Sequence, residues 1–160
     1  MVNVEKSYQK LFIGLGSNLG HREGHLNRAI ELLSNAWGDP LQSSSVLQTE
    51  PWGFESKNGF LNQVVIFRCN WHIEKILKLT QDTEKLLGRL QKSKIYYADR
   101  IIDLDLLYYG DKQIDTTMIK IPHPKISQRK FVLDSLMELD ENWLDVRLGK
   151  TIGQLYQEAL

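Results

Sequence analysis

The segment RIIDLDLLYYG, residues 100–110, alternates acidic and apolar side chains from Ile102 to Leu106 and ends at a glycine. Alternation of this kind predicts a β-strand, because successive side chains of a strand point to opposite faces of a sheet. We expect a strand over residues 101–109. Its leucines should be buried, and Asp103 and Asp105 should lie together on the other face.

The rest of the chain places this strand at the end of a regular order of elements. Short apolar runs predict strands, and helical spacing of apolar residues predicts helices. Strands are expected at 10–15, 41–48 and 60–67, and helices at 23–37 and 74–87. With residues 101–109 the order is β-α-β-β-α-β, which favours a ferredoxin-like α+β sandwich: an antiparallel sheet with helices packed on one face.

The segments after residue 110 are interpreted as additions to that core. A short strand is expected at 119–121, a helix at 131–139, and a last helix that Thr151 caps and that runs to Leu160. The second face of the sheet should then serve ligands and loops. No repeat or linker is evident among the 160 residues, so we expect one domain over residues 1–160.

Composition limits the kinds of function. Lys and Arg together number 20 and so do Asp and Glu, so a general adhesion to nucleic acid or to anionic membranes is not expected. Cys69 is the only cysteine, which excludes an intrachain disulfide. The first ten residues lack the apolar core of a signal peptide, and we expect a cytoplasmic location.

Asp103 and Asp105 form the strongest candidate site. On one face of a strand, two carboxylates two residues apart lie about 6.6 Å from each other. They repel by about 2.5 kcal/mol at an effective dielectric constant of about 20. A divalent cation would reverse the sign of that interaction, and oxygen ligands suit Mg²⁺. The alternative is an exposed strand whose acidic residues simply face water.

Basic residues around the aspartates favour a phosphate ligand. Residues 85–130 hold ten of the 20 basic residues and only five acidic ones. Arg100 lies three residues before Asp103, Lys92 lies in the preceding loop, and His123 and Arg129 follow in a proline-bounded segment. Carboxylates with metal, surrounded by cations, are what phosphoryl transfer needs. Because the chain has no G-x-x-x-x-G-K-[ST] motif, side chains and metal must hold any nucleotide.

Seven short motifs give the chain a resemblance to a known family. They are IGLGSNLG (13–20), TEPWG (49–53), FLN (60–62), a helix end with Gln81, Glu84 and Gly88-Arg89, RIIDLDLLYYG (100–110), PHP (122–124) and RKF (129–131). On these motifs the chain resembles the 6-hydroxymethyl-7,8-dihydropterin pyrophosphokinase family of folate biosynthesis. It departs from the family at Ala98-Asp99, where Gly-Pro is usual and where Asp99 adds a negative charge.

The resemblance implies an enzyme with the ferredoxin-like fold. It transfers the β,γ-diphosphate of ATP to the hydroxymethyl oxygen of 6-hydroxymethyl-7,8-dihydropterin and releases AMP. Asp103 and Asp105 would hold two Mg²⁺ ions, with Arg89 and Arg100 as further catalytic residues. Contacts with ATP are implied for Gln81, Glu84, Arg89, Lys92, Arg100, His123 and Arg129. A pterin pocket is implied from Thr49, Trp52, Phe60, Asn62 and Phe131. Partners are these small molecules, without nucleic acid or membrane, and a monomer is expected.

Other interpretations stay open at this point. Phe60 and Phe131 are also typical core aromatics, and Trp52 could anchor a loop. The same order of elements occurs in RNA-binding modules, although Asp103 and Asp105 would repel phosphate without a metal. A ligand-sensing module without catalysis is a third hypothesis. Release of AMP from ATP only in the presence of pterin and Mg²⁺ would separate the enzyme from both alternatives.

Overall fold

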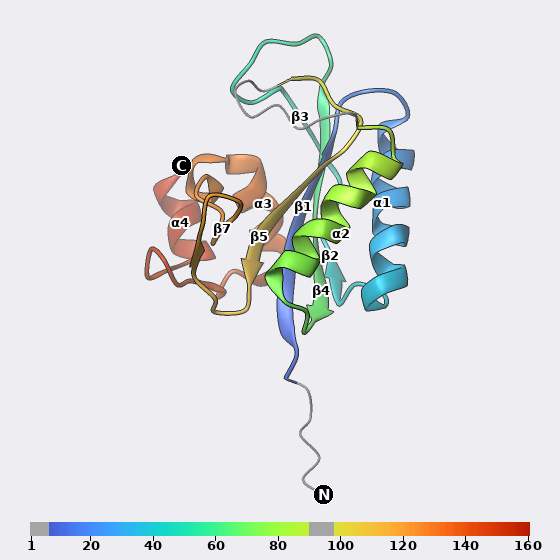
Figure 1. The fold of residues 1–160 in the computed structure, drawn as a ribbon. Coiled ribbons are helices and arrows are strands. Elements are labelled where there is room, and N and C mark those ends of the chain that lie inside the picture. The colour runs from blue at the N-terminus through green and yellow to red at the C-terminus, as the bar shows by residue number, and fades with distance from the viewer. Residues whose placement is uncertain (1–6, 90–97) are drawn as a thin grey trace, which may run out of the picture.

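The computed structural model describes residues 7–89 and 98–160, and an antiparallel sheet lies at its centre (Figure 1). The strands of this sheet run in the order β2-β4-β1-β5, and β3 also pairs with β4. The elements up to β5 are β1 (Gln9–Ser17), α1 (Arg22–Trp37), β2 (Gln42–Ser43), β3 (Leu47–Thr49), β4 (Phe60–Cys69), α2 (Ile73–Leu86) and β5 (Asp103–Tyr109). The predicted combination of helices with an antiparallel sheet is therefore confirmed.

Helices α1 and α2 cover one face of the sheet (Figure 1). The strand side chains beneath them are apolar, and burying them removes apolar surface from water. The cluster at this interface is buried and includes Leu11, Ile13, Val65, Phe67, Leu104 and Leu106 of the strands with Leu26, Ala29, Leu33 and Ile76 of the helices. This shared core holds both helices against β1, β4 and β5.

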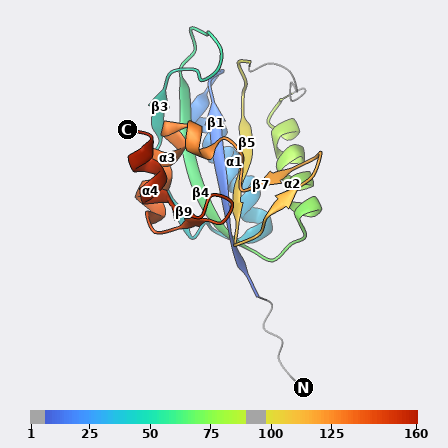
Figure 2. The ribbon, with the colours of Figure 1, turned by 90° about the vertical axis from the view of Figure 1, so that its left-hand side faces the viewer.

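The C-terminal helices cover the second face. Helices α3 (Lys130–Asp140) and α4 (Ile152–Glu158) pack there, on the side of the sheet opposite α1 and α2 (Figure 2). The strand residues under them are also apolar, namely Phe12, Val64, Ile66, Leu107 and Tyr108. The expectation of a second face left for ligands and loops is thus wrong over part of that face, because apolar side chains on both sides of the strands require cover on both sides.

Two of the expected strands differ in extent. β1 continues through Gly16 and Ser17, beyond the expected end at residue 15, because it still pairs with β4 there and Gly16 also pairs with β5. The strand expected over 41–48 is two short strands, β2 and β3, which pair separately with β4. In β5 the register against β1 shifts at Leu107, so that Leu107 and Tyr108 both belong to the cluster under α3 and α4.

The remaining C-terminal elements are short. The hairpin β6–β7 joins Ile114–Asp115 to Lys120–Ile121, a 3-10 turn η1 spans Ile126–Gln128, and β8–β9 joins Leu144–Asp145 to Lys150–Thr151. The expected Thr151 cap is confirmed, since its hydroxyl accepts the Gln154 N–H in a capping box. Over the two described ranges, no helix is long and apolar enough to cross a membrane.

Candidate functional site

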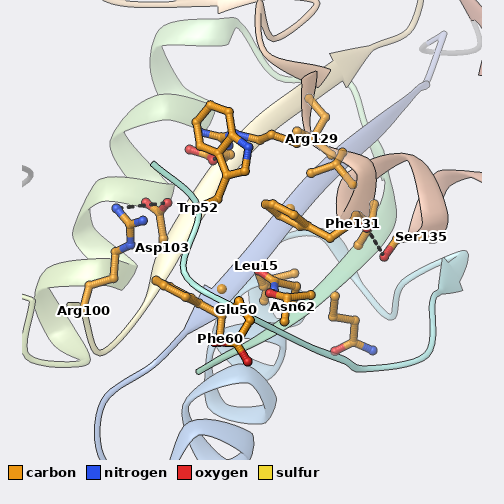
Figure 3. A pocket seen from close by; sticks show the side chains of 18 residues that line it. Leu15, Glu50, Trp52, Phe60, Asn62, Arg100, Asp103, Arg129, Phe131 and Ser135 are labelled. Carbon is orange, nitrogen blue, oxygen red and sulfur yellow. Dashed lines mark hydrogen bonds and ion pairs between the residues drawn. The ribbon is translucent and has the colours of Figure 1, made fainter. Parts of the chain in front are cut away.

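A pocket lies on the second face of the sheet, at the end where the 50–59 loop rises beside α3 (Figure 3). Its empty space, counted together with the solvent at its open mouth, is about 610 Å³. Nine of the predicted site residues line it: Thr49, Trp52, Phe60, Asn62, Arg100, Asp103, Asp105, Arg129 and Phe131. Residues from separate parts of the sequence therefore meet in one place.

The floor of the pocket consists of two rows across three strands. In the first row Gly16 of β1 pairs with Asn62 of β4 on one side and with Asp103 of β5 on the other. In the second row Gly14 lies between Val64 and Asp105. A methyl group at Gly16 would lie 3.1 Å from Asn62 Oδ1, so the absence of a side chain there keeps the floor open.

Asp103 and Asp105 share the pocket side of β5. Both line the pocket, while Leu104 and Leu106 are buried in the cluster under α1 and α2. The predicted alternation of this strand is confirmed. The common face brings two carboxylates to one cavity, which is the arrangement that suits a divalent cation.

Arginine side chains neutralise the two carboxylates. Arg89 Nη1 donates to Asp103 Oδ1 at 2.6 Å, and Arg100 Nη1 lies 3.9 Å from Asp103 Oδ2. Arg129 Nη1 donates to Asp105 Oδ2 at 3.1 Å. Three guanidinium groups thus contact two carboxylates at the pocket, and the buried Glu84 carboxylate is a further acidic neighbour of Arg89.

Glu84 of α2 contacts both the backbone of β5 and the side chain of Arg89. Its side chain is buried, and Oε1 accepts the backbone N–H of Leu104 at 2.8 Å. The same oxygen lies 3.4 Å from Arg89 Nη1. Glu84 thus fixes both the backbone between the two aspartates and the arginine that contacts Asp103. Gln81, one turn earlier on α2, is exposed and does not line the pocket.

Asn62 and Phe131 lie on the side of the pocket away from Arg100, and Phe60 lies between Asn62 and Arg100 (Figure 3). The Asn62 amide donates to the Thr49 hydroxyl, which leaves Oδ1 on the side of Gly16 as an acceptor at the floor. Phe60 is buried and supports the Arg100 guanidinium, whose carbon lies 5.2 Å from the ring centroid. Phe60 and Phe131 supply aromatic surface here, and Asn62 supplies a polar group. A flat polar heterocycle needs both.

Trp52 extends from the 50–59 loop over the side chains of Arg129 and Lys125. The centroid of its ring lies 4.9 Å from the Arg129 guanidinium carbon and 5.4 Å from Lys125 Nζ. Trp52 therefore contacts the basic group of the pocket. His123 does not line the pocket, and its Nδ1 accepts the backbone N–H of Lys125 at 3.2 Å. Lys92 lies outside the described residues.

Some lining residues were not anticipated. Glu50 and Ser135 line the pocket, and Gly14 and Gly16 make its floor. The i, i+4 spacing of Phe131 and Ser135 places them on one helix face and could have indicated Ser135. In the described part of the chain no three His, Cys, Asp or Glu side chains gather as a metal site, so a cation at the aspartates would need ligand oxygens to complete its shell.

Comparison with known proteins gives a consistent result. The family profile "7,8-dihydro-6-hydroxymethylpterin-pyrophosphokinase (HPPK)" matches residues 12–141. A Porphyromonas gingivalis protein named "2-amino-4-hydroxy-6-hydroxymethyldihydropteridine pyrophosphokinase" is 43% identical over 124 residues, which are 76% of this chain and 84% of that protein. A Bacillus subtilis protein of the same name is 36% identical over 129 residues, covering 80% of this chain and 76% of the relative.

Solved structures share the fold. A Plasmodium falciparum HPPK-DHPS triple mutant aligns with a TM-score of 0.76 at 15% identity, over 96% of this chain and 42% of that one. An HPPK-DHPS structure in complex with substrates aligns with a TM-score of 0.74 at 11% identity, over 94% of this chain and 43% of that one. The chain thus spans less than half of these longer proteins.

Proposed function

The chain belongs to the 7,8-dihydro-6-hydroxymethylpterin-pyrophosphokinase family, the pyrophosphokinases of folate biosynthesis, and from this we propose how its pocket works. ATP and the pterin bind side by side over the three-strand floor. The β,γ-diphosphate of ATP passes to the hydroxymethyl oxygen, and AMP leaves. The observation that carries this proposal is the row in which Gly16 separates Asn62 from Asp103.

The dimensions of that row suit the pterin. Asn62 and Asp103 lie on strands that flank β1, so their backbones are about 9.6 Å apart, or two strand spacings. A bicyclic heterocycle bound to Asn62 over Gly16 directs its substituent toward Asp103. Phe60 and Phe131 supply aromatic surface for the ring, and Thr49 orients the Asn62 amide. Trp52 completes the wall at the mouth.

The acidic end suits the triphosphate. Asp103 and Asp105 fit two Mg²⁺ ions, because both carboxylates share one face and the phosphate oxygens can complete each shell. Such ions, when bound, neutralise the charge that develops on the transferred group. Arg89, Arg100 and Arg129 exchange their carboxylate partners for phosphate oxygens. They then hold the diphosphate in line with the hydroxymethyl oxygen. This oxygen is activated by its position and not by a dedicated general base.

The remaining predicted contacts belong to the nucleotide. We propose that Gln81 and His123 lie along the adenosine and α-phosphate side. Glu84 acts chiefly through Arg89 and the Leu104 backbone. The order of the elements supports a ferredoxin-like core with added C-terminal helices. We propose that the chain forms one domain over residues 1–160 and acts as a monomer.

A product analysis tests the proposal. Purified protein is incubated with ATP and Mg²⁺, with and without 6-hydroxymethyl-7,8-dihydropterin, and the nucleotides are separated by ion exchange. AMP should form in one-to-one ratio with the pterin diphosphate, and only when pterin and Mg²⁺ are both present. Formation of ADP, or of AMP without pterin, would contradict the proposal.

A further inference from the structure

Asp99 bridges three segments that are distant in the sequence. Its Oδ1 accepts the Asn18 side-chain amide at 2.7 Å, and its Oδ2 accepts the Asn58 amide at 2.9 Å. Asn18 belongs to the turn after β1, and Asn58 to the 50–59 loop. One carboxylate next to Arg100 therefore joins this loop to the end of β1.

Asn18 is also hydrogen-bonded to the backbone of Arg100. The Asn18 side chain is buried, and its Oδ1 accepts the Arg100 backbone N–H at 2.7 Å. The Asn18 backbone N–H donates to the Arg100 carbonyl at 3.1 Å. Its amide also donates to the Asn58 carbonyl at 3.2 Å. The backbone of Arg100 is thus held on both sides by a residue that Asp99 orients.

We propose that Asp99 is a positioning residue for diphosphate transfer, which clasps the 50–59 loop to the β1 turn and sets the place of Arg100. This rests on the proposed function, because Arg100 and the loop matter only if the pocket takes pterin and ATP. Asp99 acts through its neighbours and not by contact with substrate. Its effect reaches the pocket through the Arg100 guanidinium, which lies over Phe60 and beside Asp103.

The negative charge of Asp99 lets it accept the hydrogen bonds of both Asn18 and Asn58. Two amide donors converge on it, and an ionised carboxylate is an acceptor at both oxygens. Hydrogen bonds from Ser56, and then from Asn18 and Asn58, lower the pKa of Asp99 below its usual value. An asparagine in its place would present an NH₂ group to one of the two donors.

A reciprocal exchange tests the clasp. Asp99→Asn should raise the KM for the pterin about tenfold, as the loss of one charge-assisted hydrogen bond implies, with a smaller change for ATP. Asn58→Asp places two carboxylates face to face, and because they repel each other it should also raise the KM for the pterin.

The double variant restores complementary partners. Its new amide at position 99 accepts from Asn18 through the carbonyl and donates its NH₂ group to the new carboxylate at position 58. The KM for the pterin should therefore return to within about twofold of the wild-type value. Asp39→Asn, just beyond the C-terminal end of α1, is the control and should leave the KM unchanged.

Hydrogen exchange of residues 54–58 separates this inference from the proposed function. Exchange should rise in each single variant and fall again in the double variant, whatever the activity. Unchanged exchange or an unchanged pterin KM in Asp99→Asn would overturn the inference, as would a double variant no better than its parents. A wild-type protein that forms no AMP would instead contradict the proposed function.

Discussion

Replacing Gly16 by alanine tests the floor of the pocket with a single methyl group. That methyl would lie 3.1 Å from Asn62 Oδ1 and 3.6 Å from Phe60 Cδ1, in the space between the pterin acceptor and Asp103. Gly16 does not have a positive φ, so alanine fits the strand and should leave the fold intact. A mismatch of one methyl group in a binding pocket costs about 1–3 kcal/mol, or roughly a 10- to 200-fold loss of affinity.

Calorimetric titration of the pterin, in the presence of Mg²⁺ and a non-hydrolysable ATP analogue, measures this loss. Gly14→Ala is the matched comparison, because the nearest atoms to its methyl all belong to Leu107, at 3.5 Å or more, and it should change pterin affinity less. Thermal unfolding checks that both variants stay folded. Wild-type pterin affinity in a folded Gly16→Ala variant would refute the proposed position of the ring.

Three further sets of substitutions probe other parts of the site. Asp103→Asn and Asp105→Asn should each lower kcat by about 100-fold or more with the fold retained by circular dichroism, and near-normal turnover in either would contradict the metal role. Phe131→Ala should weaken pterin binding by about 1–3 kcal/mol and ATP binding less; calorimetry with the opposite order would exclude stacking. Glu84→Ala should destabilise the protein by about 1–3 kcal/mol in urea unfolding, because it removes the acceptor of the buried Leu104 N–H, whereas Glu84→Gln should cost less; equal stabilities would argue against this role.

The parts of the fold that depend on local pattern could be predicted from the sequence. Alternation in residues 102–106 indicates the strand and the common face of Asp103 and Asp105, and helical spacing indicates α1 and α2. Strand ends are less predictable, because pairing with neighbouring strands carries β1 through Gly16 and Ser17. The side on which α3 and α4 pack depends on apolar residues of both strand faces, which no single segment reveals.

For the candidate site, too, only part of the arrangement could be predicted from local sequence pattern. Its charged and aromatic members stand in recognisable motifs, but their partners depend on contacts across the chain. Asp99 meets Asn18 and Asn58 at separations of 81 and 41 residues, and Trp52 packs on Arg129 from a distant loop. The role of Glu84 behind β5 likewise required the position of α2 relative to the strand.

Binding of Mn²⁺ in place of Mg²⁺, followed by electron paramagnetic resonance with a non-hydrolysable ATP analogue, counts the ions that Asp103 and Asp105 hold. We expect two tightly bound ions per chain in the wild-type complex, and the loss of at least one in Asp103→Asn and in Asp105→Asn. Two ions bound with wild-type affinity in Asp103→Asn or in Asp105→Asn would contradict the proposed metal role of these carboxylates.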